Sequence, residues 1–248
     1  MSSVTAPVAD VIVVAAGSGS RLGAAVPKAF LEVCGAPLIA HALRHVGAIS
    51  PRRVVITVPA ADPERWVDFV SRLSLPGEVE AVAGGETRQA SVQAGLIALA
   101  HRCEATGQAH PDVVLVHDAA RPCASAELWR SVWASALECG AAIPVLPATD
   151  CLKRLNARGE VEETLDRGTV GHAQTPQAFR FDWLWAAHQD AGPAPAADDA
   201  ELVERRGMTV ATVPGEKTNL KVTTAADIAI IESLLSADGA SGCQSGGG

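Results

Sequence analysis

The 248-residue sequence contains no C-x-x-C pair, no start typical of a signal peptide and no apolar run long enough to span a membrane. Its six cysteines lie far apart, which suits neither a disulfide framework nor a zinc site, so reduced thiols in a cytoplasm are expected. The opening MSSVTAPVAD has neither a basic start nor an apolar core. A membrane-spanning helix needs about 20 apolar residues, and no stretch approaches that length. The sequence therefore predicts a cytoplasmic protein without a membrane partner.

The charge balance excludes a further class of partner. A formal net charge of −8 argues against a general binder of nucleic acid or of anionic membranes. The charge is unevenly spread, because residues 11–58 hold five basic residues and a single acidic one, Glu32. A locally basic segment in an acidic protein is expected at a site for a small anion. For Arg44, Arg52 and Arg53 a solvated basic face is the alternative.

Apolar runs alternate with helical periods along the chain. Five runs have the pattern of buried strands: residues 11–15, 54–58, 79–83, 113–116 and 141–145. The alternation predicts one Rossmann-like α/β domain, residues 1–236, with a mostly parallel twisted sheet and helices on both faces. Pro144 cannot donate to a central ladder, which predicts that the fifth strand lies at an edge or ends there.

Residues 150–174 break this rhythm. Two extended runs flank the turn Asn156-Ala157-Arg158-Gly159, which predicts a protruding β-hairpin arm. Such an arm exposes strand edges, and pairing with a second subunit would cover them. The Gly-, Ala- and Ser-rich end, residues 237–248, is expected to be a disordered tail.

The first apolar run leads into a glycine-rich turn, Ala15-Ala16-Gly17-Ser18-Gly19-Ser20-Arg21, followed by Pro27-Lys28. Glycines at a strand end let backbone N–H groups approach phosphate oxygens, and ligands bind at this edge of open α/β sheets. The turn has no Gly-Lys-Ser/Thr of a P-loop and is one residue too long for the dinucleotide fingerprint. Two cations, Arg21 and Lys28, instead suit a triphosphate whose phosphorus and departing pyrophosphate gain charge during reaction. A tight turn with Arg21 facing solvent is the alternative.

Four further motifs narrow the function. They are His117-Asp118-Ala119-Ala120-Arg121-Pro122, Thr175-Pro176-Gln177-x-Phe179, Asp198-Asp199 and Leu220-Lys221-Val222-Thr223. With the glycine-rich turn they resemble, in order and spacing from about residue 11 to residue 235, the 2-C-methyl-D-erythritol 4-phosphate cytidylyltransferases. That family consists of nucleotidyltransferases of the non-mevalonate isoprenoid pathway.

The resemblance implies roles in phosphate chemistry. In the family, the residues matching Arg21 and Lys28 stabilise the pentavalent phosphorus, and the one matching Asp118 approaches the nucleotide and a Mg²⁺ ion. Those matching Arg167 and Lys221 hold the methylerythritol phosphate, with Arg167 reaching the neighbouring chain's active site through the arm. A carboxylate at a strand end is a suitable Mg²⁺ contact. The alternatives are helix capping for Asp118 and surface charge for Arg167 and Lys221.

The resemblance also implies two sets of binding residues. The nucleotide-binding set contains, besides Asp118, Ala15, Ala16, Gly17, Gly19, Gly85, Glu86 and Ser91. The last three are expected to contact cytosine, with capping of the following helix as the alternative for Ser91. The substrate-binding set is Arg121, Cys151, Thr175 and Thr223. A structural salt bridge is the alternative for Arg121, and Cys151 stands where the family often has threonine, a stronger donor than a thiol.

These roles predict a homodimeric enzyme that transfers CMP from CTP to 2-C-methyl-D-erythritol 4-phosphate in the presence of Mg²⁺. The 4-phosphate attacks the α-phosphorus in line, and 4-diphosphocytidyl-2-C-methyl-D-erythritol and pyrophosphate are formed. A cytidylyltransferase for another polyol phosphate, such as ribitol 5-phosphate, is the alternative within the same fold. A nicotinamide-dependent oxidoreductase and a non-catalytic nucleotide-sensing module are the alternatives from other classes.

Overall fold

The computed structural model describes residues 6–17, 26–192 and 194–242, with the backbone alone from residue 238 onwards. Gly19 and Arg21 of the glycine-rich turn therefore lie outside the described residues. The described strands are β1 (Ala9–Val14), β2 (Glu32–Val33), β3 (Ala36–Pro37), β4 (Arg53–Val58), β5 (Glu78–Ala83), β6 (Val113–Asp118), β7 (Ala141–Pro147), β8 (Lys153–Leu155), β9 (Val161–Thr164), β10 (Gly171–Ala173), β11 (Gln177–Arg180) and β12 (Ala211–Pro214). The described helices are α1 (Leu38–Ala42), α2 (Pro63–Ser71), α3 (Arg88–Thr106), α4 (Ala126–Cys139), α5 (Phe181–Gln189), α6 (Asp199–Arg205) and α7 (Ala225–Gly242), with short 3-10 helices η2 (Lys28–Phe30), η3 (Val46–Ile49) and η4 (Arg167–Thr169).

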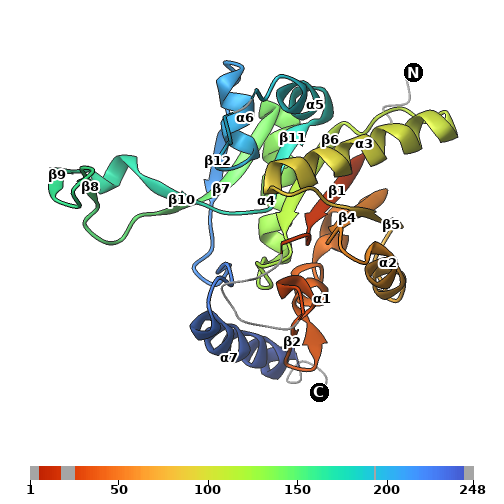
Figure 1. The fold of residues 1–248 in the computed structure, drawn as a ribbon, viewed down its shortest axis with the longest axis horizontal. Helices are drawn as coiled ribbons and strands as arrows, with labels where there is room; N and C mark the ends of the chain where they lie inside the picture. The colour runs from red at the N-terminus through yellow and green to blue at the C-terminus, as the bar shows by residue number, and fades with distance from the viewer. Residues whose placement is uncertain (1–5, 18–25, 193, 243–248) are drawn as a thin grey trace.

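An eight-stranded twisted sheet forms the centre of the domain, in the order β10-β7-β11-β6-β1-β4-β5, with β12 pairing on β7 (Figure 1). The strands β6, β1, β4 and β5 run parallel to one another, and β12 runs parallel to β7. Only β10 and β11 pair antiparallel within this sheet. The predicted mostly parallel α/β sheet is therefore confirmed, and its central strands all end at one edge.

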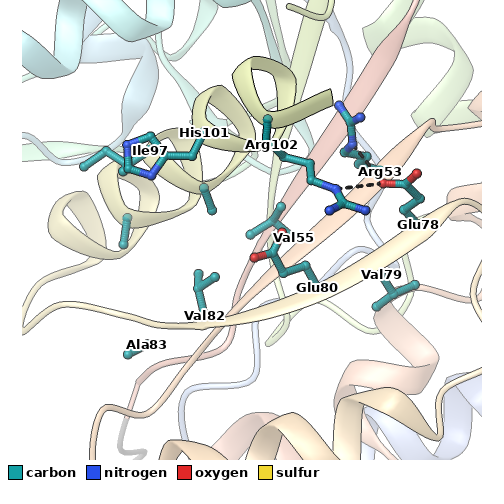
Figure 2. Close-up of a pocket in the computed structure, with 13 residues that line it drawn as sticks. Arg53, Val55, Glu78, Val79, Glu80, Val82, Ala83, Ile97, His101 and Arg102 are labelled. Carbon is teal, nitrogen blue, oxygen red and sulfur yellow. Dashed lines mark hydrogen bonds and ion pairs between the residues drawn. The ribbon is translucent and has the colours of Figure 1, made fainter. Parts of the chain in front are cut away.

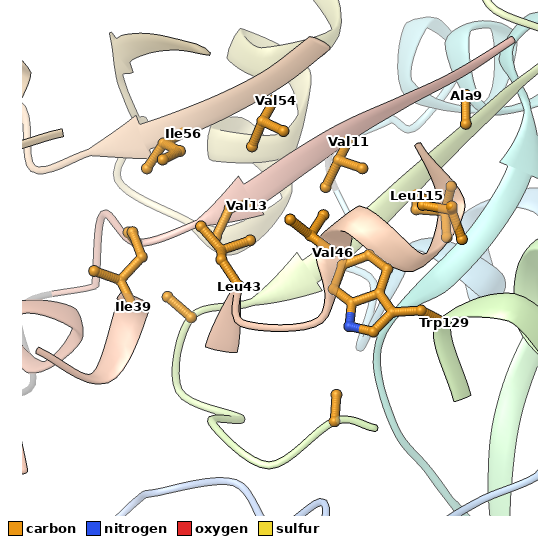
Figure 3. Close-up of a cluster of buried hydrophobic side chains, with 14 of the residues drawn as sticks. Ala9, Val11, Val13, Ile39, Leu43, Val46, Val54, Ile56, Leu115 and Trp129 are labelled. Atoms are coloured by element: carbon orange, nitrogen blue, oxygen red, sulfur yellow. The ribbon is translucent and has the colours of Figure 1, made fainter. Parts of the chain in front are cut away.

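The sheet is buried on both faces. Val11, Ile12 and Val13 of β1 are all fully buried. Because successive side chains of a strand point to opposite faces, both faces of the sheet must be covered at this strand. One apolar cluster joins β1 and β4 to η3 and α4, where Trp129 packs beside Val46 and Leu115 (Figure 3). A second cluster joins the opposite face to α3, α5 and α6. These two clusters hold the central strands, and with them the carboxyl edge of the sheet, in place.

The fifth predicted strand, β7, differs from the sequence expectation for Pro144. Instead of lying at an edge, β7 pairs with β12 along one side and with β11 and β10 along the other. On that second side β11 pairs with Ala141 and Ala142, and β10 begins its pairing at Val145. Pro144 therefore lies between the two partner strands, where its carbonyl accepts from Gln174 N–H at 2.9 Å. The ladder has a gap where a proline, which has no N–H to donate, is tolerated.

The predicted hairpin arm is present as a separate two-stranded sheet of β8 and β9, which projects away from the domain (Figure 1). The Asn156 carboxamide oxygen accepts from the N–H groups of Arg158 and Glu160, and this closes the predicted turn. Gly159 takes a positive φ of 78°, a conformation that glycine adopts without steric cost.

Helix α7 packs apart from the central sheet, against β2 and α1, with Ile231 and Leu235 buried beside Val33 and Leu38. Its first turn is capped by Asp227, whose carboxylate accepts from the N–H groups of Thr223 and Thr224 at 2.7 Å each. The helix continues to Gly242, into the stretch 237–248 that was expected to be a disordered tail. Residues 243–248, the rest of that stretch, lie outside the described residues. Among the described residues, no helix combines the length and the apolar character needed to cross a membrane.

Candidate active site

A cavity of about 470 Å³ opens at the carboxyl ends of β1, β5 and β6. It is lined by Val14, Ala15, Ala16, Gly17, Lys28, Ala29, Gly85, Glu86, Thr87, Arg88, Ser91, Asp118, Ala119, Ala120 and Lys221. This lining unites the described part of the predicted nucleotide-binding set with both predicted catalytic lysines. The substrate-binding residues predicted from the motifs do not line it.

The first turn begins where β1 ends, and Ala15 N–H donates to the Thr57 carbonyl of the neighbouring β4 at 3.0 Å. The chain returns to the cavity at η2, whose Phe30 is buried and stacks on Trp66 with a ring-centroid distance of 4.1 Å. This anchor places Lys28, two residues earlier, in the cavity wall. The Lys28 ammonium donates to the Val222 carbonyl at 2.7 Å, which ties the turn to the Lys221 motif.

The opposite wall is the loop between β5 and α3. Gly84 fills a place without room for a side chain, because a Cβ there would lie 2.4 Å from the Ala16 Cβ. A Cβ at Gly85 would lie 2.4 Å from the Ala90 Cβ. The Ser91 hydroxyl accepts from Gly85 N–H at 3.2 Å and donates to the Thr87 carbonyl at 2.9 Å.

These contacts settle the alternative role considered for Ser91. The cap of α3 is Thr87, whose hydroxyl accepts from Ala90 N–H at 3.0 Å. Ser91 instead lies in the first turn of the helix and holds the backbone of Gly85 against it. Its buried hydroxyl therefore shapes the loop in which cytosine contacts were predicted.

Asp118, the last residue of β6, lies between two cations. Its Oδ1 accepts from Arg88 Nε at 3.0 Å and its Oδ2 accepts from Lys221 Nζ at 2.5 Å. Burial by itself would raise the pKa of the Asp118 carboxyl, but Arg88 and Lys221 outweigh it and hold the pKa well below its usual range. Asp118 is thus an ionised carboxylate at a strand end and not a helix cap, a role that Ser125 fills for α4.

Behind Asp118 lies a buried hydrogen-bonded group that contains Thr175. The Thr175 hydroxyl accepts from Asp118 N–H at 3.0 Å and lies 3.0 Å from His117 Nδ1. It donates to that nitrogen, because the ring proton of His117 lies on the other nitrogen, which faces a carbonyl. The other ring nitrogen of His117 donates to the Arg121 carbonyl at 3.1 Å. Thr175 is only 4% exposed, and its hydroxyl holds the end of β6 in place.

The other predicted substrate-binding residues lie outside the cavity. The Arg121 guanidinium donates to the carbonyls of Asn219 at 2.7 Å and Ala173 at 3.3 Å, so it binds backbone and not the carboxylate of a structural salt bridge. The Thr223 hydroxyl donates to Asp227 at 2.8 Å. Cys151 is exposed at the base of the arm, and Arg167, also on the arm, donates to the Thr149 carbonyl at 3.3 Å. Arg167 therefore does not line the cavity that Lys221 lines in the same chain.

Arg88 and Asp199 are site residues to which the sequence motifs assigned no role. Arg88 lines the cavity and bridges Asp118 to Asp199, which is 1% exposed. Asp199 belongs to the Asp198-Asp199 motif, and Arg88 lies between Glu86 and Ser91, two of the residues expected to contact cytosine. Their spacing in the sequence carries no sign that they meet, since they are 111 positions apart.

A second cavity, of about 750 Å³, lies elsewhere, between α3 and the edge strand β5 (Figure 2). Three of its charged lining residues pair with one another, because Arg53 and Arg102 both donate to the Glu78 carboxylate. Arg52 and Arg53 also bind the fully buried Asp10. Neither arginine therefore belongs to a solvated basic face or to the cavity that contains Lys28.

Parallel strand ends, a glycine-rich first turn and a cavity lined by Lys28, Lys221 and Asp118 are typical of nucleotidyltransferases of the α/β class. The sequence model of the IspD family, 2-C-methyl-D-erythritol 4-phosphate cytidylyltransferase, matches residues 9–237. The chain belongs to this family.

Two curated relatives and two solved structures illustrate the similarity. The protein named bifunctional enzyme IspD/IspF from Rhodopseudomonas palustris is 42% identical over 233 residues, which cover 91% of this chain and 55% of that protein. The protein of the same name from Clavibacter michiganensis is 41% identical over 96% of this chain and 57% of its own length. The chain spans about half the length of these curated relatives.

Among solved structures, the 2-C-methyl-D-erythritol 4-phosphate cytidylyltransferase from Thermus thermophilus is 33% identical with a TM-score of 0.71, covering 91% of this chain and 97% of that one. The 4-diphosphocytidyl-2C-methyl-D-erythritol synthase from Anaerococcus prevotii is 28% identical with a TM-score of 0.78, covering 93% of this chain and 99% of that one.

The buried imidazole of His117, behind Asp118, predicts that the stability of the fold depends on pH. Burial lowers the pKa of His117 from 6.5 to about 4. Between these values the unfolded chain binds a proton that the folded chain does not, so the free energy of unfolding decreases as the pH falls from 6.5 towards 4 and this contribution is constant above 6.5. Urea unfolding at a series of pH values should show this slope, and His117→Gln should reduce it. An equal slope in the variant would contradict the assignment.

Proposed function

We propose that this protein transfers CMP from CTP to 2-C-methyl-D-erythritol 4-phosphate. The observation that carries the proposal is the convergence of Lys28, Lys221 and Asp118 on one cavity beside Ala16-Gly17 and Gly85. Two ammonium groups from distant motifs suit a site that brings together two anionic reactants. Membership of the IspD family supports the same activity.

In the reaction, an oxygen of the 4-phosphate attacks the α-phosphorus of CTP. The bond from the α-phosphorus to the oxygen bridging to the β-phosphorus breaks, and pyrophosphate leaves with that electron pair. Lys28, held beside the first turn by η2, offsets the negative charge that grows on the phosphorus and on the leaving group. Arg21, expected to act with Lys28, lies outside the described residues.

The base is proposed to lie against the loop that contains Gly85, Glu86 and Ser91. Without a side chain at position 85, a ring can come close to the backbone of the loop, and Ser91 keeps that backbone fixed. Backbone donors and acceptors at fixed positions select one pattern of base edge over another because an unpaired buried polar group costs free energy.

Mg²⁺ is proposed as the cofactor, with Asp118 as its protein contact. Among the described residues there is no group of three or more carboxylate, thiol or imidazole side chains that would hold a metal by itself. A lone carboxylate fits Mg²⁺, which keeps several waters and is held largely by substrate phosphates in nucleotide sites. When bound, the ion would neutralise charge on the triphosphate. A cytoplasmic location is likewise proposed, from the cysteine pattern.

A second chain is proposed to complete the substrate site. Arg167 and Cys151 lie on the exposed arm and not in the cavity of their own chain. Leu155 and Val161 are paired across β8 and β9 and are 57% and 61% exposed, so together they form an apolar surface on the arm that a partner chain would cover. An arm reaching the neighbouring cavity would bring Arg167 towards Lys221, so that both hold the 4-phosphate.

The substrate assignment predicts a specific response to a panel of polyol phosphates. Purified protein with CTP and Mg²⁺ should release pyrophosphate with 2-C-methyl-D-erythritol 4-phosphate and much more slowly with ribitol 5-phosphate. Pyrophosphate formation can be followed by a coupled phosphatase assay. Faster turnover of ribitol 5-phosphate would overturn the assignment, and CTP binding without any pyrophosphate would indicate a nucleotide-sensing module.

Lys28→Ala should reduce turnover more than it weakens CTP binding, because the ammonium is assigned to charge that develops during reaction. We expect kcat to fall by about 100-fold or more, and the CTP dissociation constant to rise by less than about tenfold. Steady-state kinetics and calorimetry measure the two quantities. Lys217→Ala is the matched control, since Lys217 is exposed and does not line the cavity. Equal losses in kcat and in affinity would show that Lys28 only binds the ground state.

Mixing two inactive variants tests whether the arm acts across subunits. Arg167→Ala and Lys221→Ala should each be inactive alone. After mixing and subunit exchange, about a quarter of all sites should regain both side chains if Arg167 serves the partner, because half of the dimers are mixed and each has one intact site. If both residues serve their own chain, no activity returns. Arg158→Ala, at the tip of the same arm, should stay active throughout.

A further inference from the structure

A continuous row of charges runs from the cavity into the buried face of α6. The guanidinium of Arg88 donates through Nε to Asp118 Oδ1 at 3.0 Å and through Nη1 to Asp199 Oδ2 at 2.6 Å. Asp199 Oδ1 in turn accepts from His188 Nε2 at 3.0 Å. The row therefore links α3 and β6 to α5 and α6, two pairs of neighbouring elements that are far apart in the sequence.

Only an arginine can make the central link of this row. A guanidinium has donors in a rigid planar fork and can bind two carboxylates at once, whereas the ammonium of lysine is a point charge on a flexible stem. Burial would lower the pKa of Arg88, but Asp199 and Asp118 outweigh it and raise the pKa, so the guanidinium is charged. The fork is thus fixed at both sides and cannot rotate towards one carboxylate without losing the other.

The two neighbouring acids of the Asp198-Asp199 motif have different tasks. Asp198 caps α6 by accepting from Glu201 N–H at 3.0 Å, and it also accepts from Gln177 Nε2 at 2.8 Å. Asp199 turns inward and is 1% exposed between Arg88 and His188. The pair therefore contains one acid that starts the helix and one that points to the active-site arginine.

The two cations on Asp118 are held unequally. Lys221 is 40% exposed, has a single contact with Asp118 and is proposed to move to the substrate phosphate. Arg88 is 24% exposed and is anchored by Asp199. When Lys221 turns to a phosphate, Arg88 is the partner that keeps Asp118 ionised and aimed into the cavity.

We propose that Asp199 is a positioning residue of the transfer reaction, acting through Arg88 on the orientation of Asp118. The proposal rests on the function proposed above. Asp199 touches neither the cavity nor a reacting atom, so its effect on turnover passes through the two side chains in front of it. Removing its charge would leave the Arg88 fork with one carboxylate and free to swing, and Asp118 would then lose its fixed direction.

A double-mutant cycle between Asp199 and Asp118 tests this route, because residues that act through one another show non-additive effects. Asp199→Asn keeps the side-chain size and removes the charge. In the otherwise unchanged protein it should lower kcat/KM for CTP by about 10- to 100-fold, the range typical of supporting partners of an active-site ligand. In an Asp118→Asn background the same change should have less than about a twofold effect.

Asp198→Asn is the matched control, because its carboxylate caps the helix and does not contact Arg88. Its effect on kcat/KM for CTP should be the same in the protein that retains Asp118 and in the Asp118→Asn background. Arg88→Lys is a second variant that keeps the charge, and it should reproduce the Asp199→Asn loss with the thermal unfolding midpoint close to that of the unmodified protein. A full Asp199→Asn loss that persists in the Asp118→Asn background would overturn the proposal.

A binding readout separates this proposal from the proposed function. The CTP dissociation constant, measured by calorimetry with Mg²⁺, should follow the same cycle. Asp199→Asn should raise it in the protein that retains Asp118 and leave it unchanged in the Asp118→Asn background. If the unmodified protein releases no pyrophosphate with the polyol phosphate, the proposed function fails while the binding cycle still tests the positioning route. Additive binding effects in active protein would reject the positioning route alone.

Discussion

The site depends on one carboxylate held between two cations at the end of a buried strand. Asp118 is 6% exposed, and an unpaired charge at such a depth would cost several kcal/mol or lose its ionisation. Arg88 and Lys221 remove that cost from opposite sides, and they come from segments more than 100 residues apart. The fold of α3, β6 and the segment before α7 must therefore be complete before the carboxylate is usable.

The parallel sheet supplies the geometry for this convergence. Because β1, β4, β5 and β6 run in one direction, the glycine-rich turn, the Gly84-Gly85 loop and Asp118 all follow strand ends at the same edge. Hydrogen bonds between successive strand ends, such as Ala15 N–H to the Thr57 carbonyl, keep that edge regular. Two apolar clusters on the two faces then make it rigid enough to support charged side chains.

Much of this could be predicted from residues that carry local signals. Apolar runs such as Val11–Val14 indicate buried strands, and the turn residues of the arm indicate a hairpin. The order of the motifs carried the family resemblance, and that resemblance implied that Lys28, Asp118 and Lys221 would share one site. What could not be predicted depends on side-chain direction: Thr175 faces inward to His117, Arg121 binds carbonyls, and Arg88 meets Asp199. The interior position of Pro144 escaped prediction because the gap opposite it is made by two strands that come later in the chain.

The close approach of Gly84 to Ala16 has a mechanical meaning. The turn proposed to bind the phosphates and the loop proposed to bind the base touch at a point where one extra carbon atom would lie 2.4 Å from its neighbour. The distance between the turn and the loop is therefore fixed by this contact. Neither segment can move towards a ligand without displacing the other. A nucleotide that binds as proposed would have to fit a spacing that uncharged atoms of Ala16 and Gly84 set.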